Sequence, residues 1–348
     1  MWAWISNIPS LLGIFAAQLM ACGAILSGFG IQFSHAVVGI GAVILISNAM
    51  SGMWGVVVVD FIQVAIIMVG IPLAAVAAAT QTDAGAPGTL LAAAFIPDGM
   101  GRRAVFLITP FLFSISVSYD AFIRYQSSRS ASVAKWACII SGVLVVAVSF
   151  CASFIGAAGR QAFPSVPNDG LMTHVIRTSL PPVVGGIVVS ALLAAAMSTA
   201  NALLISLAGC FSRDFYNKVL HPTAELDDLP HVTRYVRLAV VGSLLVGVVA
   251  ALTARGILDT IIIFNYPYMA SMLVPLLGGL LWSGATTKGA YAAMAVGGAI
   301  GVAAFLAGAP GPLHGLFNID LALLIAFAVS AVVLVAVSLA TGTKVKPA

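Results

Sequence analysis

The chain has 348 residues, of which 61% are hydrophobic and 7% charged, and its formal net charge is +4. With a mean hydropathy of +1.11, this composition excludes an ordinary soluble globular domain and predicts an all-α, polytopic membrane helical bundle. Because a spanning helix needs about 20 residues, the length allows about ten spans with short connections.

Apolar runs of spanning length follow one another along the whole chain. Only Ser51 and Gly52 separate the second run from the third, so this boundary is the least defined of all. We expect no soluble domain, and we interpret residues 1–348 as one integral membrane domain. The predicted spans are residues 8–29, 34–50, 52–79, 104–123, 133–158, 182–210, 233–253, 259–282, 288–308 and 319–341.

Basic residues gather in alternate connections, which predicts the orientation of the chain. One set of connections and ends carries ten of them, including every lysine, and the opposite set carries five arginines. The first set is therefore expected in the cytoplasm, with both termini there, and the protein in the inner or plasma membrane. The positive charge then reflects topology, and no nucleic-acid partner is expected. The first set is Arg124, Arg129, Lys135, Arg213, Lys218, Arg234, Arg237, Lys288, Lys344 and Lys346.

No sequence pattern indicates covalent chemistry. The chain lacks a nucleophile elbow, a phosphate-binding loop and a dinucleotide fingerprint, and its four cysteines have no metal-type spacing. We therefore expect neither an enzyme nor an organic cofactor.

The span at 182–210 contains an unusual stripe. Ala195, Ser198 and Thr199 stand at i, i+3 and i+4, so they share one helix face. Small and hydroxyl residues on one face indicate either close helix packing, continued here by Ala191 and Ala202, or oxygen ligands for a hard cation.

Three stretches resemble the sodium:solute symporter family, in the family's order and spacing. They are MSGMWGVVVVDFIQ (residues 50–63), AAAMSTANALL (residues 194–204) followed by SRDFY (residues 212–216), and YMASMLVPLLGGLLWSGATTKGAYAAMAVGG (residues 268–298). The resemblance extends over roughly residues 8–341.

The resemblance implies a leucine-transporter-type fold of two inverted five-helix repeats, with ligands held where helices break near the midplane. It would make residues 8–79 the remainder of the first repeat, 104–282 the second repeat and 288–341 two accessory helices. It also implies about three further helices before Met1, including half of the cation and substrate sites. A separate N-terminal segment is therefore a possible partner.

For the cation, the resemblance implies that Ala195 and Ser198 supply carbonyl oxygens and Thr199 its hydroxyl to a sodium ion. Asp60 is a carboxylate inside a span, which costs several kcal/mol without water or a partner. The resemblance places it on the path by which sodium leaves, although Val59 stands where the family usually has Thr. The other interpretation is that Asp60 pairs with a loop arginine and closes the cytoplasmic gate.

For the solute, the resemblance implies that the span at 104–123 breaks beside the substrate. Its aromatic and hydroxyl side chains suit a small polar organic solute. Asp120 would favour a cationic solute if it faced the cavity, or would form an i, i+4 ion pair with Arg124 at the inner end, and we favour the ion pair. The expected substrate residues are Phe113, Ser114, Ser116, Ser118 and Tyr119.

Pro267 and Pro275 predict a bend in the span at 259–282. Tyr266, Pro267 and Tyr268 then belong to an implied extracellular gate, although tyrosines also mark membrane interfaces.

The sequence therefore predicts sodium-coupled symport of a small organic solute across the lipid bilayer. Two alternatives remain open. One is a transport-incompetent fragment or a regulatory or sensory membrane module, and the other is proton coupling through Asp60 or Asp120.

Overall fold

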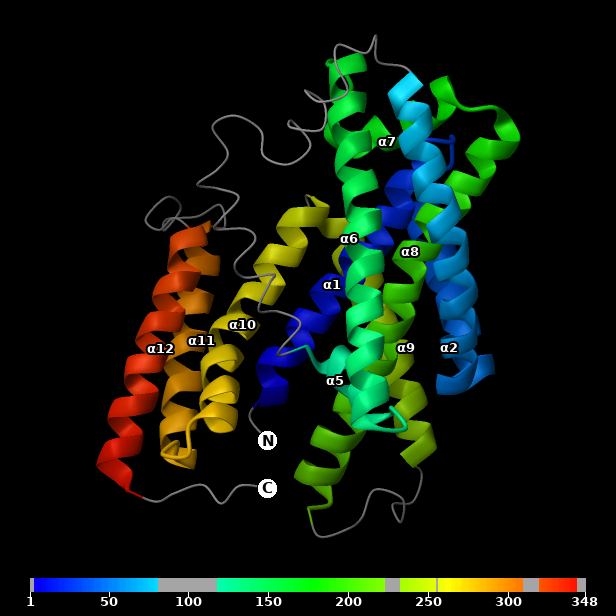
Figure 1. Cartoon of the computed structure of the whole chain (residues 1–348). Helices are drawn as coiled ribbons and strands as arrows, with labels where there is room; N and C mark the ends of the chain where they lie inside the picture. Colours follow the sequence, from blue (N-terminus) through cyan, green and yellow to red (C-terminus); the bar gives the residue numbers. More distant parts are fainter. Residues whose placement is uncertain (1–2, 81–117, 223–231, 255, 309–318, 343–348) are drawn as a thin grey trace.

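The computed structural model describes residues 3–80, 118–222, 232–254, 256–308 and 319–342, and these residues form helices and short connections (Figure 1). Among these residues, seven helices are long and apolar enough to cross a membrane. The expected all-α membrane bundle is confirmed within this part of the chain. In chain order the elements are α1 (Ala3–Ser27), α2 (Phe33–Thr80), α5 (Tyr119–Gln126), α6 (Ala131–Ala162), α7 (Asn168–Ser179), α8 (Pro182–Gly209), η1 (Cys210–Leu220), α9 (Val232–Thr253), α10 (Ile257–Leu281), α11 (Thr287–Gly308) and α12 (Ile319–Thr341).

The helix α2 corrects one predicted boundary. Its 48 residues run through Ser51 and Gly52 without a helix end, so a straight helix would be about 72 Å long. Both of its ends nevertheless lie at the α7 end of the bundle, because Phe33 packs on Gly23 near the end of α1 and Ala78 shares a hydrophobic cluster with α7. The helix therefore doubles back.

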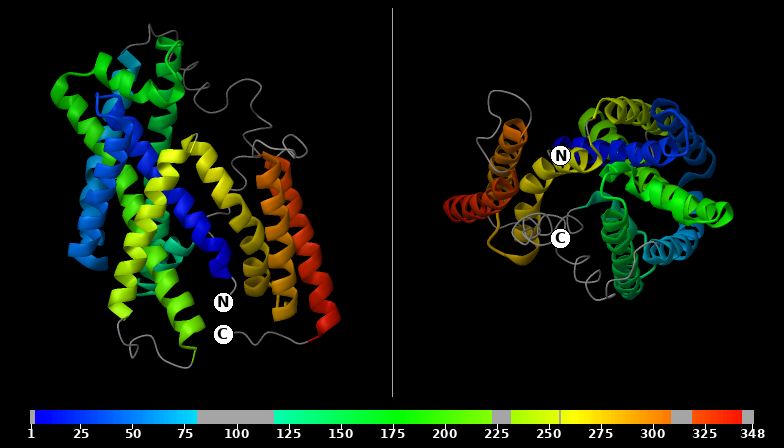
Figure 2. Two further views of the ribbon diagram at one scale, coloured as in Figure 1. Left: turned by 180° about the vertical axis from the view of Figure 1, so that it is seen from behind. Right: turned by 90° about the horizontal axis from the view of Figure 1, so that it is seen from above.

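Doubling back divides α2 into two arms. The apolar stretches within it are Phe33–Asn48 and Val57–Ala79. In the view from above, the darker and lighter blue arms stand at different places around the bundle (Figure 2). The two predicted spans thus exist, although the helix between them is not interrupted.

The interior is centred on α1, which runs through the middle of the molecule against α2, α8, α9 and α10 (Figure 1). Phe15 and Leu19 of α1 are completely buried, together with Leu204 and Leu207 of α8. Gly247 of α9 lies against the Phe15 ring, where a β-carbon would collide with it. Inside a bilayer such close packing, made possible by small residues, is what holds helices together.

At one flank, α10, α11 and α12 pack as a group, coloured yellow to red in Figure 1. Gly297 of α11 lies against the Ala270 carbonyl of α10, and Gly278 of α10 lies against Leu334 of α12. Pro267 and Pro275 are inside α10, which curves along its length in Figure 1, as the prolines predict.

Two elements at the ends of the spans differ from expectation. The helix α8 continues without a break into the π-helix η1, so the helical segment extends beyond the predicted end at residue 210 to Leu220. Within η1, Lys218 pairs with Asp214 at 3.6 Å, an i, i+4 contact. The short helix α7 was not predicted, because its twelve residues are too few and too polar for a membrane span.

The helix α5 begins at Tyr119, and Ser118 before it is extended, with φ −67° and ψ 121°. The predicted span at 104–123 is therefore not one continuous helix, which agrees with the break expected there. Residues 104–117 lie outside the described part of the chain.

Candidate functional site

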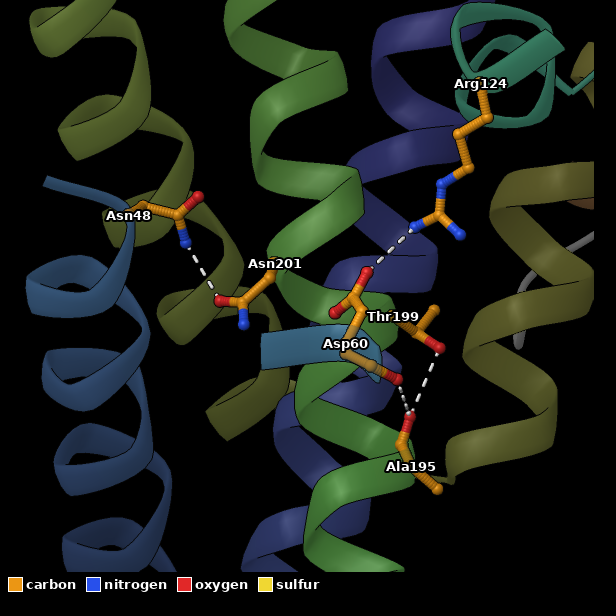
Figure 3. A network of polar contacts seen from close by, with 7 residues as sticks. Asn48, Asp60, Arg124, Ala195, Thr199 and Asn201 are labelled. Atoms are coloured by element: carbon orange, nitrogen blue, oxygen red, sulfur yellow. Dashed lines mark hydrogen bonds and ion pairs between the residues drawn. The ribbon is translucent and has the colours of Figure 1, made fainter. Parts of the chain in front are cut away.

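Three oxygen atoms gather on one face of α8. The Ser198 hydroxyl donates to the Ala195 carbonyl at 3.0 Å, and the Thr199 hydroxyl donates to the same oxygen at 3.3 Å (Figure 3). Ala195 and Ser198 are half-buried, and Thr199 is exposed. Backbone-directed hydroxyls of this kind are common in helices and need no ion. They also keep three potential ligand oxygens together on an accessible surface.

The alternative interpretation, a packing stripe, holds for part of the same face. Ala191 is completely buried, and Gly70 of α2 lies so close to it that a β-carbon at Gly70 would collide with the Ala191 methyl. Two turns later Thr199 is exposed. The stripe therefore packs at Ala191 and is open at Thr199.

A cleft of about 420 Å³ lies at the α5 end of α8, lined by residues of α2, α5 and α8. Within it, Arg124 Nη2 lies 3.5 Å from Asp60 Oδ2 (Figure 3). Asp60 Oδ1 is buried and has no hydrogen-bond partner among the described residues. The structure thus pairs Asp60 with an arginine, as one of its two interpretations expected, although Arg124 lies in the last turn of α5 and not in a loop.

The favoured ion pair between Asp120 and Arg124 is wrong. Asp120 accepts a hydrogen bond from the Ser118 hydroxyl, and the described structure contains no Asp120–Arg124 ion pair. Both residues line the same cleft. The guanidinium contacts Asp60 instead. Unlike Asp120, which accepts from Ser118, Asp60 has an oxygen, Oδ1, with no hydrogen-bond partner among the described residues.

Of the expected substrate residues, Phe113, Ser114 and Ser116 lie outside the described residues. Ser118 and Tyr119 line a cavity of about 50 Å³ between α5, α1 and α10. The structure brings two polar residues to this cavity that the sequence had not indicated, Asn7 and Ser10, and it adds Asn265, which the sequence had placed beside the gate tyrosines. A polar pair at i, i+3 in an otherwise apolar span, as Asn7 and Ser10 form, is the signal that could have found them.

The three expected gate residues lie within α10. Tyr266 is 3% and Tyr268 6% exposed, and Pro267 is half-buried between them. Both tyrosines belong to a hydrophobic cluster shared with α12, and Tyr268 also lines the small polar cavity.

Another polar contact joins α8 to the first arm of α2. Asn48 Nδ2 donates to Asn201 Oδ1 at 2.9 Å, and Asn201 is 1% exposed (Figure 3). Asn201 follows Thr199 by two residues, so this contact fixes the oxygen-bearing part of α8 against α2. A single asparagine within an apolar span is a signal that points to such contacts.

Comparisons with known proteins identify the relatives of this chain. The sequence model described as the sodium:solute symporter family matches residues 116–297. The chain is 32% identical over 184 residues to the sodium/pantothenate symporter of Escherichia coli (strain K12), an alignment covering 51% of this chain and 36% of the relative. It is 23% identical over 316 residues to the sodium/pantothenate symporter of Haemophilus influenzae (strain ATCC 51907 / DSM 11121 / KW20 / Rd), covering 84% of this chain and 64% of the relative.

The fold is also similar to that of a solved structure. A substrate-bound, outward-open Na⁺-coupled sialic acid symporter matches 99% of this chain and 75% of its own, with a TM-score of 0.79 and 18% identity. At that identity the likeness concerns the fold. The chain spans less than two thirds of the length of the two sodium/pantothenate symporters.

Proposed function

The chain belongs to the sodium:solute symporter family, and on that premise we propose that it carries out sodium-coupled symport of a small organic solute across the cell membrane. Transport alternates access to a central site, which faces one side of the membrane and then the other. An inward sodium gradient drives the cycle, and no covalent step is needed.

The observation that carries this proposal is the group of three oxygens on α8. A sodium ion is a hard cation that prefers oxygen ligands, as calcium and magnesium do. The hydroxyls of Ser198 and Thr199 each lie within hydrogen-bonding distance of the Ala195 carbonyl oxygen, and Thr199 is exposed. Because these hydroxyls donate their protons to the helix carbonyl, their lone pairs are available to the ion, and the Ser198 carbonyl joins them as a ligand.

The contact between Asp60 and Arg124 supports a gate at the cytoplasmic side. While the pair is formed, the guanidinium occupies the cleft and its positive charge opposes a cation there. When the pair separates, the Asp60 carboxylate attracts the sodium ion from the α8 oxygens. In this proposal Asp60 therefore has both roles, first as part of the gate and then as part of the exit path.

In this proposal both termini are cytoplasmic, so the α5 end of the bundle faces the cytoplasm and the α7 end faces outwards. Residues 8–79 belong to the first repeat, 104–282 to the second, and 288–341 are accessory helices. Tyr266, Pro267 and Tyr268 contribute to the outer gate.

The solute binds next to α5, at the extended residue where that helix begins. Ser118 and Tyr119 line the polar cavity there, and Phe113, Ser114 and Ser116 of the preceding segment complete the substrate residues in this proposal. The lipid bilayer and the two transported species are the partners.

The test is an uptake screen with the purified full chain in proteoliposomes. Radiolabelled amino acids, sugars, carboxylates and vitamins are offered with an inward sodium gradient, with an inward proton gradient, and with neither. We expect at least one solute to accumulate under the sodium gradient alone. Accumulation driven only by the proton gradient would contradict sodium coupling, and no accumulation of any solute would favour a regulatory or sensory role.

A further inference from the structure

The cavity of about 50 Å³ between α1, α5 and α10 has several polar side chains in its wall, although α1 and α10 are apolar enough to span a membrane. Asn7, Ser10 and Asn265 in its wall are 5%, 1% and 6% exposed. Buried polar groups cost free energy unless they are hydrogen-bonded. The directions of their hydrogen bonds therefore indicate what the cavity binds.

Both asparagines in the wall direct their amide nitrogens to sulfur atoms. Asn7 Nδ2 donates to Cys210 Sγ at 3.2 Å, and Asn265 Nδ2 donates to Met269 Sδ at 3.4 Å. Asn265 Oδ1 accepts from the Ser10 hydroxyl at 2.9 Å. Asn7 Oδ1 is buried with no partner among the described residues. Asn7 Oδ1 is thus left for a ligand, Asn265 Oδ1 keeps a second lone pair, and each amide nitrogen keeps one further N–H.

Asp120 adds a carboxylate to the same wall. Its hydrogen bond from Ser118 leaves further acceptor capacity, because an ionised carboxylate accepts about four. Arg124, the nearest cation along α5, is directed to Asp60. Asp120 therefore has no ion-pair partner in the described structure, and the cavity offers three acceptor groups, one of them negative.

We propose that this cavity binds a protonated amine of the transported solute, with Asp120, Asn7 and Asn265 as acceptors, an inference that rests on the proposed transport function. An ammonium group has three donors, which matches the three acceptor groups. A volume of about 50 Å³ holds one such group and not a whole solute. Asp120 also lines the cleft of about 420 Å³, which has room for the remainder of the molecule.

The test measures binding to the purified full chain in lipid nanodiscs, by calorimetry and without any ion gradient. The probe is methylammonium chloride, and methanol, potassium chloride and sodium chloride are compared at matched ionic strength. We expect methylammonium to bind and methanol and potassium not to bind. Asp120→Asn should raise the methylammonium Kd at least about tenfold, because it removes the charge from the strongest acceptor.

The matched control is Asp214→Asn, which removes a carboxylate that is paired with Lys218 and is outside the cavity. It should leave methylammonium binding unchanged. Asn7→Asp provides a second variant in which binding is gained, since a second carboxylate in the wall should lower the methylammonium Kd about tenfold. This gain is measurable even if Asp120→Asn does not fold.

Two results would overturn the amine site. Equal responses to methylammonium, sodium and potassium would identify a metal-cation site, and no response to methylammonium in the wild type or in Asn7→Asp would identify a cavity for ordered water only. Because no gradient is applied, a failure of sodium-driven uptake in proteoliposomes would contradict the proposed function and leave the binding result intact.

Discussion

At the residue scale, the contact between Asp60 and Arg124 is the proposed gate of the cleft at the α5 end of the bundle. The Arg124 side chain is 58% exposed and that of Asp60 20%, and their atoms are 3.5 Å apart. An ion pair this open to solvent contributes at most about 1 kcal/mol to stability. The contact is therefore weak enough to form and separate within a transport cycle.

This weakness gives a prediction for Arg124→Gln. The free energy of unfolding should fall by less than about 1 kcal/mol, whereas sodium release to the cytoplasmic side should become faster because the gate has lost its charge. Thermal unfolding and sodium efflux from proteoliposomes measure the two effects. Arg124→Lys, which keeps a positive charge at this position, should leave efflux near the wild-type rate, and an unfolding loss well above about 1 kcal/mol for Arg124→Gln would show a structural contact instead.

The amide contact between Asn48 and Asn201 should behave differently, because Asn201 is 1% exposed. Asn201→Leu removes the α8 acceptor of the half-buried Asn48 amide, which keeps its hydrogen bond to the Ile44 carbonyl, so the loss should be about 1 kcal/mol, at the low end for an unsatisfied donor. Replacing both asparagines by leucine should recover most of that loss. Thermal unfolding of the two single variants and the double variant measures this, and additive losses in the double variant would contradict the contact.

The sequence could not predict which residues these side chains contact. Arg124 and Asp60 are separated by 64 residues, and Asn7 and Cys210 by 203. Helical spacing identified Asp120 as a neighbour of Arg124 on one face, but which carboxylate the guanidinium contacts depends on how α2 packs beside α5. The grouping of Ala195, Ser198 and Thr199 could be predicted because it is local to one helix.

At the element scale, the contact between α2 and α8 depends on small residues where the helices approach. Gly70 of α2 meets the buried Ala191 of α8, whereas Gly39, in the other arm of α2, has open space around it. The same substitution at Gly70 and at Gly39 therefore compares a packed position with an open one in the same helix.

Gly70→Ala should destabilise the protein, because its methyl group would overlap with Ala191 and force the helices apart, at a cost of about 1–3 kcal/mol. Gly39→Ala should be neutral or stabilising by up to about 1 kcal/mol, since alanine is the better helix former. Thermal unfolding of both variants under the same conditions measures the difference. Equal effects of the two substitutions would contradict the close approach of α2 and α8.

The spans were predictable because length and apolar composition define them, and α9, α11 and α12 begin and end within two residues of expectation. Ser51 and Gly52 fall inside the bounds of α2, between its two apolar arms. The helix α7 was not predicted, because its polar sequence is typical of a connection between spans. The continuation of α8 as η1 depends on packing against α1 and α9, which sequence periodicity does not report.

At the scale of the whole molecule, the account requires one orientation in the membrane. Ser130 lies at the α5 end and Ser165 at the α7 end of the bundle, and both are exposed. In intact cells a membrane-impermeant thiol reagent should label a Ser165→Cys variant and not a Ser130→Cys variant. Permeabilised cells should label both, with the wild-type chain as the control for its own cysteines. The reverse pattern would invert the proposed topology.

The central claim is that the three oxygens of α8 bind sodium. Thr253 of α9 provides a matched control, because its exposed hydroxyl donates to the Val249 carbonyl at 2.9 Å in the same i to i−4 manner as Thr199 but on another helix. The substitution Thr253→Ala therefore removes an equivalent hydroxyl from a position with no proposed ligand role.

The most direct measurement is equilibrium binding of radioactive sodium to the purified full chain and to the two threonine variants. We predict that Thr199→Ala raises the sodium Kd at least about tenfold, a loss of about 1.4 kcal/mol, and that Thr253→Ala leaves the Kd unchanged. Sodium binding with the wild-type Kd in Thr199→Ala would contradict the account.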